Sequence, residues 1–420
     1  MGFADAVMAG QLGARSLAAV AVGGSFWFLG FTLCLGILMA ISPIVARHYG
    51  AKNYHLIGRY TRQGIYLGAA MGLPLILFGN FLVPPLMAIF GIDAEFRELT
   101  GAYVAAITFG APGIFVFLAL RFTTEGVGYM RPIMYTSLFA LTCNVFLNYV
   151  LMFGKFGAPE LGAVGCGYAS AITMWLVMLA LLTYMARSSV YKAFDIFCRV
   201  APLRLPVLKE IVTLGMPIAI TVTAEAGLFA AVSILMGTRG TQITAAHQIA
   251  INFASTTFMI PLALSAATTV RVGQLLGAGE LAAARMNGIV GILLCAAIMT
   301  CSAAFLLIFR DAVVGLYTDD SGVISIAISL LLMASVFQIA DGVQIGAAGA
   351  LRGYKDTAFP MVINIFSFWV LAFPLAYLAA ITYKAAPNLV WAGFVAGLSC
   401  AATLLTWRYL KVSRRTLAAG

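Results

Sequence analysis

The stretch VTLGMPIAITVTAEAGLFAAVSILMG, residues 212–237, decides the fold class of this chain. It is mostly apolar, its only charged residue is Glu225, and it is long enough to cross a bilayer as a helix. Similar runs recur along the whole chain of 420 residues, which is 62% hydrophobic and 10% charged, with a mean hydropathy of +1.00. These properties exclude a soluble globular protein and predict an all-α integral membrane protein, because the runs are too long and too uniform for barrel strands.

Gly, Pro and charged residues divide the apolar runs into twelve predicted membrane spans, of which the first is only partial. The predicted ranges are 1–11 (partial), 16–46, 62–88, 98–122, 131–153, 163–186, 207–237, 242–271, 285–309, 323–350, 358–381 and 390–411. No signal peptide with a basic start and a cleavage site is present in the sequence.

The charges of the joining segments alternate from one segment to the next. One set of segments carries 19 of the 25 Lys and Arg residues, including the C-terminal group around Arg414, so the positive-inside rule predicts a cytoplasmic C-terminus. The net charge of +10 therefore reflects orientation in a membrane rather than nucleic-acid binding. The largest cytoplasmic segment predicts an N-lobe at 1–186, a linker at 187–206 and a C-lobe at 207–420.

The chain partly matches itself at a shift of 227 residues. Gly50-Ala51 falls on Gly277-Ala278, and Asp93 falls on Asp320. With one more residue of shift, Pro132 falls on Pro360. Six helices separate the copies, so the two lobes have the same orientation and form a parallel repeat, which is a common plan among transporters.

The repeat also predicts that the first helix lacks its N-terminal half. The seventh helix begins near residue 207, so its counterpart would begin about 20 residues before Met1. We expect a different start codon or a shortened chain to explain this, and an N-terminal peptide of the purified full-length protein beginning at Met1 would contradict that explanation.

Three acids lie inside predicted spans, namely Asp5, Glu225 and Asp341. A carboxylate at the middle of a membrane helix costs about 2.5–3.5 kcal/mol on insertion scales, so it is expected to have partners or a use. Asp341 lies between Gln338 and Gln344 at a spacing of three residues, which predicts one polar helix face. These acids are either proton- or cation-binding groups or protonated structural ones, and Asp5 is close enough to a helix end to be solvated.

Other polar side chains are candidates for partners of these acids or for the lining of a cavity. Each of them alone is more often a packing hydrogen bond between helices. The candidates are Asn144 and Asn148 on the fifth span, Ser170 and Thr173 on the sixth, and Gln248 and Asn252 on the eighth. With His247, the last two predict a polar face lining a pore, and Phe253 is a candidate for an apolar pocket that accepts flat organic cations.

The sequence offers little sign of metal or enzyme chemistry. His247 has no Cys or acidic neighbour at ligand spacing, and the seven cysteines contain no CxxC pair, so we expect them to be reduced core residues. The sequence contains no nucleotide-binding loop, HExxH motif or nucleophile elbow. We therefore expect no enzyme, no metal site and no cofactor beyond a coupling ion.

Several motifs, in order along the chain, resemble those of the MATE (multidrug and toxic compound extrusion) transporters of the NorM type. They are MGFADAVMAG at 1–10, KFGAPELGAVGCG at 155–167, AAHQ at 245–248, RVG at 271–273 and LRGYKD at 351–356. The family's twelve helices in two six-helix lobes agree with the repeat.

The resemblance implies a Na⁺- or H⁺-coupled antiporter that exports cationic or amphiphilic drugs by alternating access. It implies a cation site formed by Glu225 and Asp341 in the C-lobe, and it ties Asp5 of the N-lobe to coupling. We further expect a monomer in the bacterial inner membrane that binds small organic cations, with no nucleic-acid partner.

Two alternatives remain. A flippase for lipid-linked oligosaccharides of the same wider superfamily should have basic residues inside its cavity, and no Lys or Arg falls at the middle of a predicted span. A membrane scaffold or sensor without transport should have soluble domains or binding tails, and the sequence shows neither. The sequence does not separate Na⁺ from H⁺ coupling, because carboxylates and amides serve both.

Overall fold

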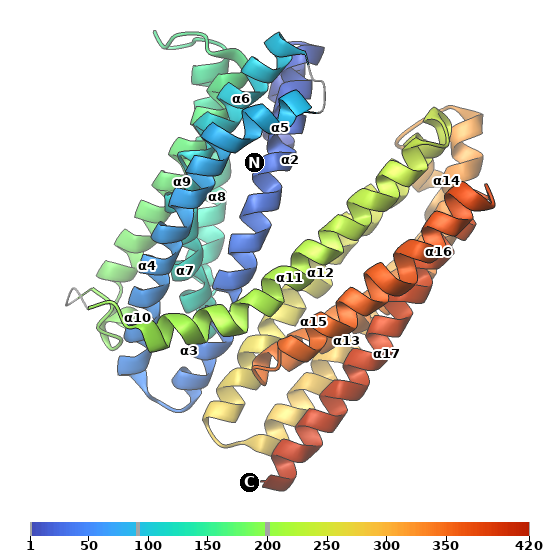
Figure 1. Ribbon diagram of the computed structural model, residues 1–420. Helices are drawn as coiled ribbons and strands as arrows, with labels where there is room; N and C mark the ends of the chain where they lie inside the picture. The colour runs from blue at the N-terminus through green and yellow to red at the C-terminus, as the bar shows by residue number, and fades with distance from the viewer. Residues whose placement is uncertain (1, 90–92, 198–201, 420) are drawn as a thin grey trace. The chain divides into compact units, whose positions relative to one another are not determined.

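The computed structural model describes residues 2–89, 93–197 and 202–419 (Figure 1). Over these ranges the chain is helical and has no strand, which confirms the predicted all-α fold. Its contacts divide it into two compact units. Unit 1 comprises Met1–Tyr49 and Asn53–Ala219, and unit 2 comprises Gly50–Lys52 and Ile220–Gly420.

Unit 1 is a bundle of helices that begins with a short helix and continues with longer ones. A π-helical turn at Phe78–Leu82 joins α4 to α5, so these two helices form one continuous run. The helices are α1 (Gly2–Gln11), α2 (Ala14–Met39), α3 (Ile41–Gly50), α4 (Tyr54–Leu77), α5 (Val83–Ile89), α6 (Ala94–Thr108), α7 (Ala111–Val127), α8 (Arg131–Met152), α9 (Gly162–Arg187), α10 (Ser189–Lys192) and the first part of α11 (Leu205–Gly237).

Unit 2 consists of long helices around an aromatic core in which Phe337, Trp391 and Phe394 are buried against one another. After the second part of α11 it contains α12 (Thr241–Gly277), α13 (Leu281–Gly315), α14 (Ser321–Gly353), α15 (Ala358–Ile365), α16 (Phe373–Tyr377) and α17 (Pro387–Ala419). Two π-helical segments, Phe366–Ala372 and Leu378–Thr382, extend α15 and α16 into one run.

In the described residues, ten helical runs are long and apolar enough to cross a membrane, and the bent pair α6–α7 brings the number to eleven. The two helices of this pair meet at 42°, where Gly110 precedes α7 and Pro112 lies in its first turn. This agrees with the eleven complete spans predicted, and α1 is the short helix predicted as the partial first span.

Backbone conformations repeat between the units at the predicted shift. Gly13 and Gly240, 227 residues apart, have φ of 113° and 116° and directly precede α2 and α12. Further positive-φ residues pair in the same way: Lys52 with Gly279, Gly128 with Lys355 and, with one more residue of shift, Phe156 with Lys384. The internal repeat is therefore visible in the turns as well as in the residues.

Asp93 and Asp320, which the repeat aligns, have the same role at the start of a helix. Asp93 caps α6 by accepting from the Phe96 backbone amide at 3.3 Å, and Asp320 caps α14 by accepting from the Gly322 amide at 2.8 Å. A side-chain oxygen at this position satisfies one of the amides that a helix leaves without a partner.

The division between the units falls inside α11, later than the predicted linker 187–206, part of which (198–201) lies outside the described residues. The first part of α11 packs tightly against α2. A Cβ on Gly36 would approach the Ala219 amide to 2.7 Å, and one on Gly215 would approach the Ile37 Cα to 2.7 Å. These glycines let the two backbones meet, so residues up to Ala219 belong to unit 1.

In unit 2, α12 and α14 are joined by hydrogen bonds from hydroxyl groups to backbone carbonyls. Ser265 Oγ donates to the Ile345 carbonyl at 2.6 Å, and Thr269 Oγ1 donates to the Gly349 carbonyl at 2.7 Å. Gly349 allows this approach, because a Cβ there would come within 2.6 Å of the Ser265 carbonyl. Small residues and hydroxyl donors of this kind hold membrane helices together.

We predict that Gly349→Ala lowers the melting temperature of the purified protein in detergent. The added methyl group must separate α12 from α14, and overpacking of this kind typically costs about 1–3 kcal/mol. Gly237→Ala is the control, because a Cβ there has no atom within 4 Å. Equal melting temperatures for the two variants would contradict this account of the α12–α14 contact.

Candidate functional site

In unit 1, the structure brings Asp5 together with three of its four predicted partners. Asn148 Nδ2 donates to Asp5 Oδ1 at 2.6 Å, and Ser170 Oγ donates to Asp5 Oδ2 at 3.3 Å. Asn144 Nδ2 donates to Ser170 Oγ at 3.3 Å. We call these four buried residues, Asp5, Asn144, Asn148 and Ser170, the Asp5 cluster.

Two oxygens of the Asp5 cluster accept no hydrogen bond from the described residues. They are Asn144 Oδ1 and Asn148 Oδ1, and both side chains are fully buried. Leaving a buried acceptor without a donor costs about 1–3 kcal/mol. A bound cation would satisfy both oxygens, because carboxylate and amide oxygens are ligands that hard cations prefer.

Thr173 does not belong to the Asp5 cluster, although it lies on the same helix as Ser170 and is buried. Its hydroxyl donates to the Ala169 carbonyl at 2.7 Å, within its own helix. A bond of this kind from Thr to the preceding turn is common inside helices.

In unit 2, the predicted polar face of α14 is present and buried. Gln338, Asp341 and Gln344 are at most 4% exposed. Asp341 Oδ1 and the Oε1 atoms of both glutamines accept no hydrogen bond from the described residues, while Gln338 Nε2 donates to Thr257 Oγ1 at 3.1 Å. We call Gln338, Asp341 and Gln344, together with Glu225, the Asp341 cluster.

Glu225 joins this cluster from α11. It is half-buried and lies after Ala219, in the part of the helix that belongs to unit 2. Its carboxylate interacts electrostatically with Asp341 and with Arg352, near the end of α14. Two acids and one base therefore share this region of unit 2.

The predicted candidates at the start of α12 have contacts of their own. Gln248 and Asn252 are exposed, and Asn252 Oδ1 accepts from the Tyr317 hydroxyl at 3.1 Å. Phe253 stacks on Phe305 with ring centroids 6.4 Å apart. The Phe253 carbonyl also accepts from Thr257 Oγ1 at 3.2 Å, and Thr257 in turn accepts from Gln338 of the Asp341 cluster.

His247 is buried in unit 2 and does not line a pore, so that expectation is wrong for this residue. Trp391 Nε1 donates to His247 Nδ1 at 3.2 Å, so Nε2 carries the proton and donates to Ser233 Oγ at 3.0 Å. The Ser233 hydroxyl in turn donates to the Phe229 carbonyl at 2.9 Å. A neutral imidazole with both nitrogens satisfied therefore connects α11, α12 and α17.

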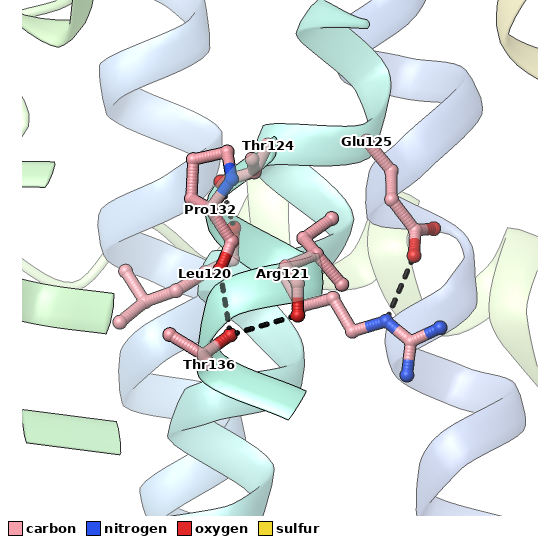
Figure 2. A network of polar contacts seen from close by, with 7 residues as sticks. Leu120, Arg121, Thr124, Glu125, Pro132 and Thr136 are labelled. Carbon is pink, nitrogen blue, oxygen red and sulfur yellow. Dashed lines mark hydrogen bonds and ion pairs between the residues drawn. The ribbon is translucent and has the colours of Figure 1, made fainter. Parts of the chain in front are cut away.

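Sequence reasoning missed Glu125, because it ended the fourth span at residue 122 whereas α7 continues to Val127. Glu125 is buried, and Arg121 Nε donates to its Oε1 at 2.8 Å, one helical turn away (Figure 2). Thr124 and Thr136 in the same view donate to backbone carbonyls one turn earlier. The spacing of four residues between Arg121 and Glu125 could have revealed this ion pair, in which the guanidinium neutralises the carboxylate.

Within the residues that the structure describes, no group of three or more His, Cys, Asp or Glu side chains could hold a metal ion. Six of the cysteines are free thiols, and Cys198 lies outside the described residues. The side chains of the Asp5 and Asp341 clusters offer mainly oxygen atoms as possible ligands for a cation.

These features define a polytopic α-helical membrane protein with two repeated units, each containing a buried carboxylate. The family model described as MatE matches residues 1–150 and 217–378. The chain belongs to this family, the MATE transporters, and the resemblance seen in its motifs is thereby confirmed. Members are secondary transporters, so this chain is a transporter and not an enzyme.

Curated relatives match the chain over almost its whole length. It is 36% identical over 415 residues to the "Probable multidrug resistance protein NorM" of Halalkalibacterium halodurans, covering 99% of this chain and 91% of the relative. It is 38% identical over 419 residues to the protein of the same name in Xanthomonas campestris pv. campestris, covering 100% and 91%. The "Multidrug resistance protein PmpM" of Pseudomonas aeruginosa is 36% identical over 422 residues, with 99% and 88% covered.

Solved structures share the fold at lower identity. A structure titled "Crystal structure of MATE in the bent conformation" matches with a TM-score of 0.89 at 21% identity, over 99% of this chain and 92% of that chain. The "eukaryotic MATE transporter AtDTX14" matches with a TM-score of 0.86 at 23% identity, over 99% and 93%.

We predict that His247→Phe destabilises the protein, because it leaves the Trp391 and Ser233 groups without their partner inside unit 2. Each buried polar group without a partner costs about 1–3 kcal/mol. Gln248→Ala is the matched control, since Gln248 is the adjacent but exposed residue. If thermal unfolding in detergent showed the two variants to be equally stable, the hydrogen-bonded chain through His247 would have no structural role.

Proposed function

We propose that this protein is a multidrug exporter of the bacterial inner membrane, driven by an inward flow of Na⁺ or H⁺, with its C-terminus in the cytoplasm. One observation carries the proposal: each unit contains a buried carboxylate next to amide oxygens that lack donors. The relatives are named as multidrug resistance proteins, which supports a drug substrate over a lipid-linked oligosaccharide.

Cation binding would act on the two clusters by neutralising charge. An ionised carboxylate away from water costs several kcal/mol unless a positive charge accompanies it. A cation at Asp5, or at Glu225 and Asp341, removes that cost and so changes the relative stability of inward- and outward-facing states. The membrane potential adds about 2.3 kcal/mol for each charge that moves inward across 100 mV.

A cationic drug would compete with the coupling ion for the same negative charge. Release of the drug on one side and entry of the ion on the other then complete an exchange by alternating access. The protein acts as a monomer in this scheme, because each unit of one chain carries its own cluster.

We predict that Asp341→Asn abolishes transport of ethidium, measured as uptake into everted vesicles or efflux from intact cells, because an amide has no negative charge for a cation to neutralise. Asp320→Asn is the matched control, since Asp320 caps the same helix at its N-terminus. That change should leave both the coupling and the helix cap intact, because Asn caps a helix about as well as Asp. Normal export by Glu225→Gln combined with Asp341→Asn would refute carboxylate coupling in unit 2.

We predict that the coupling ion can be identified by measuring dye export with and without Na⁺ at fixed pH. Loss of export on removing Na⁺ identifies Na⁺ as the driver, whereas export that persists and stops when the proton gradient is collapsed identifies H⁺. Export that survives removal of both gradients would contradict the proposed coupling altogether.

A further inference from the structure

A sulfur atom lies beside the Asp5 cluster, although a purely oxygen-based cation site would not need one. Cys166 is fully buried on α9, one helical turn before Ser170 and on the same face. Its thiol lies near enough to the Asp5 carboxylate to interact with it electrostatically. The carboxylate therefore has a thiol beside it as well as the amide and the hydroxyl that donate to it.

Close packing on both sides holds Cys166 in this position. A Cβ on Gly167 would come within 2.8 Å of the Tyr103 carbonyl of α6, and one on Gly165 would come within 2.7 Å of the Leu151 carbonyl carbon of α8. The two glycines therefore allow α9 to approach both neighbouring helices. This packing places the sulfur in a preformed site, which lowers the cost of binding a ligand.

A second, independent feature points to a cation at the same place. Asn148 is fully buried, and its Nδ2 donates to Asp5 Oδ1 while its Oδ1 has no donor. Because both atoms belong to one small amide group, that oxygen lies at the edge of the same cluster. Asn144 Oδ1, likewise without a donor, lies on the same helix face.

We propose that Cys166 and the Asp5 cluster form a binding site for a thiophilic divalent cation of the Zn²⁺ and Cd²⁺ class. Thiolate sulfur selects such ions, whereas carboxylate and amide oxygens alone favour hard cations. Cys166 Sγ and an Asp5 oxygen are the charged ligands, and Asn148 Oδ1 and the Ser170 hydroxyl complete a mixed set. As the metal–sulfur bond forms, the thiol proton leaves to water, and no atom changes oxidation state.

A metal held in this way would stop transport. One thiolate and one carboxylate balance the charge of a divalent cation, and the metal keeps Asp5 occupied when the coupling ion should bind and leave. The arrest of transport rests on the proposed coupling role of Asp5, whereas the binding of the metal does not. Na⁺ at high concentration should weaken the inhibition, because it competes for Asp5.

Cd²⁺ is the probe. It is used with the purified full-length protein and with everted vesicles in which the protein transports ethidium. Binding is measured by the ultraviolet charge-transfer absorption of the cadmium–thiolate bond, and arrest by the Cd²⁺ concentration that halves each variant's own export rate. We expect Cys166→Ala to reduce the absorption by one site. It should also raise the half-inhibitory concentration by about 10-fold or more, since even indirect contacts change metal affinity by about 10–100-fold.

Cys295→Ala is the matched control, because Cys295 is equally buried but its thiol faces the Pro261 carbonyl, at 3.7 Å, in unit 2. It should keep the wild-type absorption and inhibition. Cys166→Ser should behave as Cys166→Ala does, and it tests the proposal if the alanine variant does not fold, because serine is close to cysteine in size and polarity and removes only the sulfur.

Equal cadmium absorption by the wild type and both Cys166 variants would overturn the metal site and leave the proposed coupling untouched. Absorption that depends on Cys166, together with normal ethidium export by Asp5→Asn, would overturn the arrest and the coupling role of Asp5 but not the metal site.

Discussion

The structure depends on the cost of a charge or an unpaired oxygen inside a membrane. Glu125 meets this cost with a base of its own, because it pairs with Arg121 one turn away on α7. Asp5 has no such ion pair among the described residues, and its carboxylate accepts from an amide and a hydroxyl, which supply no positive charge. Asp341 Oδ1 accepts no hydrogen bond from the described residues. In the proposed coupling, an arriving cation supplies the charge that the fold does not.

The repeat supplies the scaffold but not the sites. Turns and caps recur at one shift, as Gly13 with Gly240 and Asp93 with Asp320 show. The acids do not recur, because the position aligned with Asp5 is Val232, which lies fully buried in the hydrophobic core of unit 2. Backbone geometry is required in both units for the same helices to pack, whereas a carboxylate is tolerated only where its neighbours can hold it.

The sequence alone was enough to predict the helices and the partners of Asp5. Long apolar runs and alternating charges identify spans directly, and a spacing of four residues places Asn144 and Asn148 on one face. It was not enough for His247 or Cys166. Adjacent residues on a helix point about 100° apart, so His247 is buried while Gln248 is exposed. Which of them faces the core depends on how the helix is rotated against its neighbours, and a single sequence does not record that rotation.

In the proposed coupling, the two clusters differ in how much charge an arriving cation would offset. The Asp5 cluster contains one carboxylate, so one monovalent ion would neutralise it. The Asp341 cluster contains two acids, and Arg352 at the end of α14 acts on Glu225. This guanidinium would offset part of the charge on Glu225. We therefore expect a cation that enters unit 2 to gain most beside Asp341, where three buried oxygens on one helix face have no donor among the described residues.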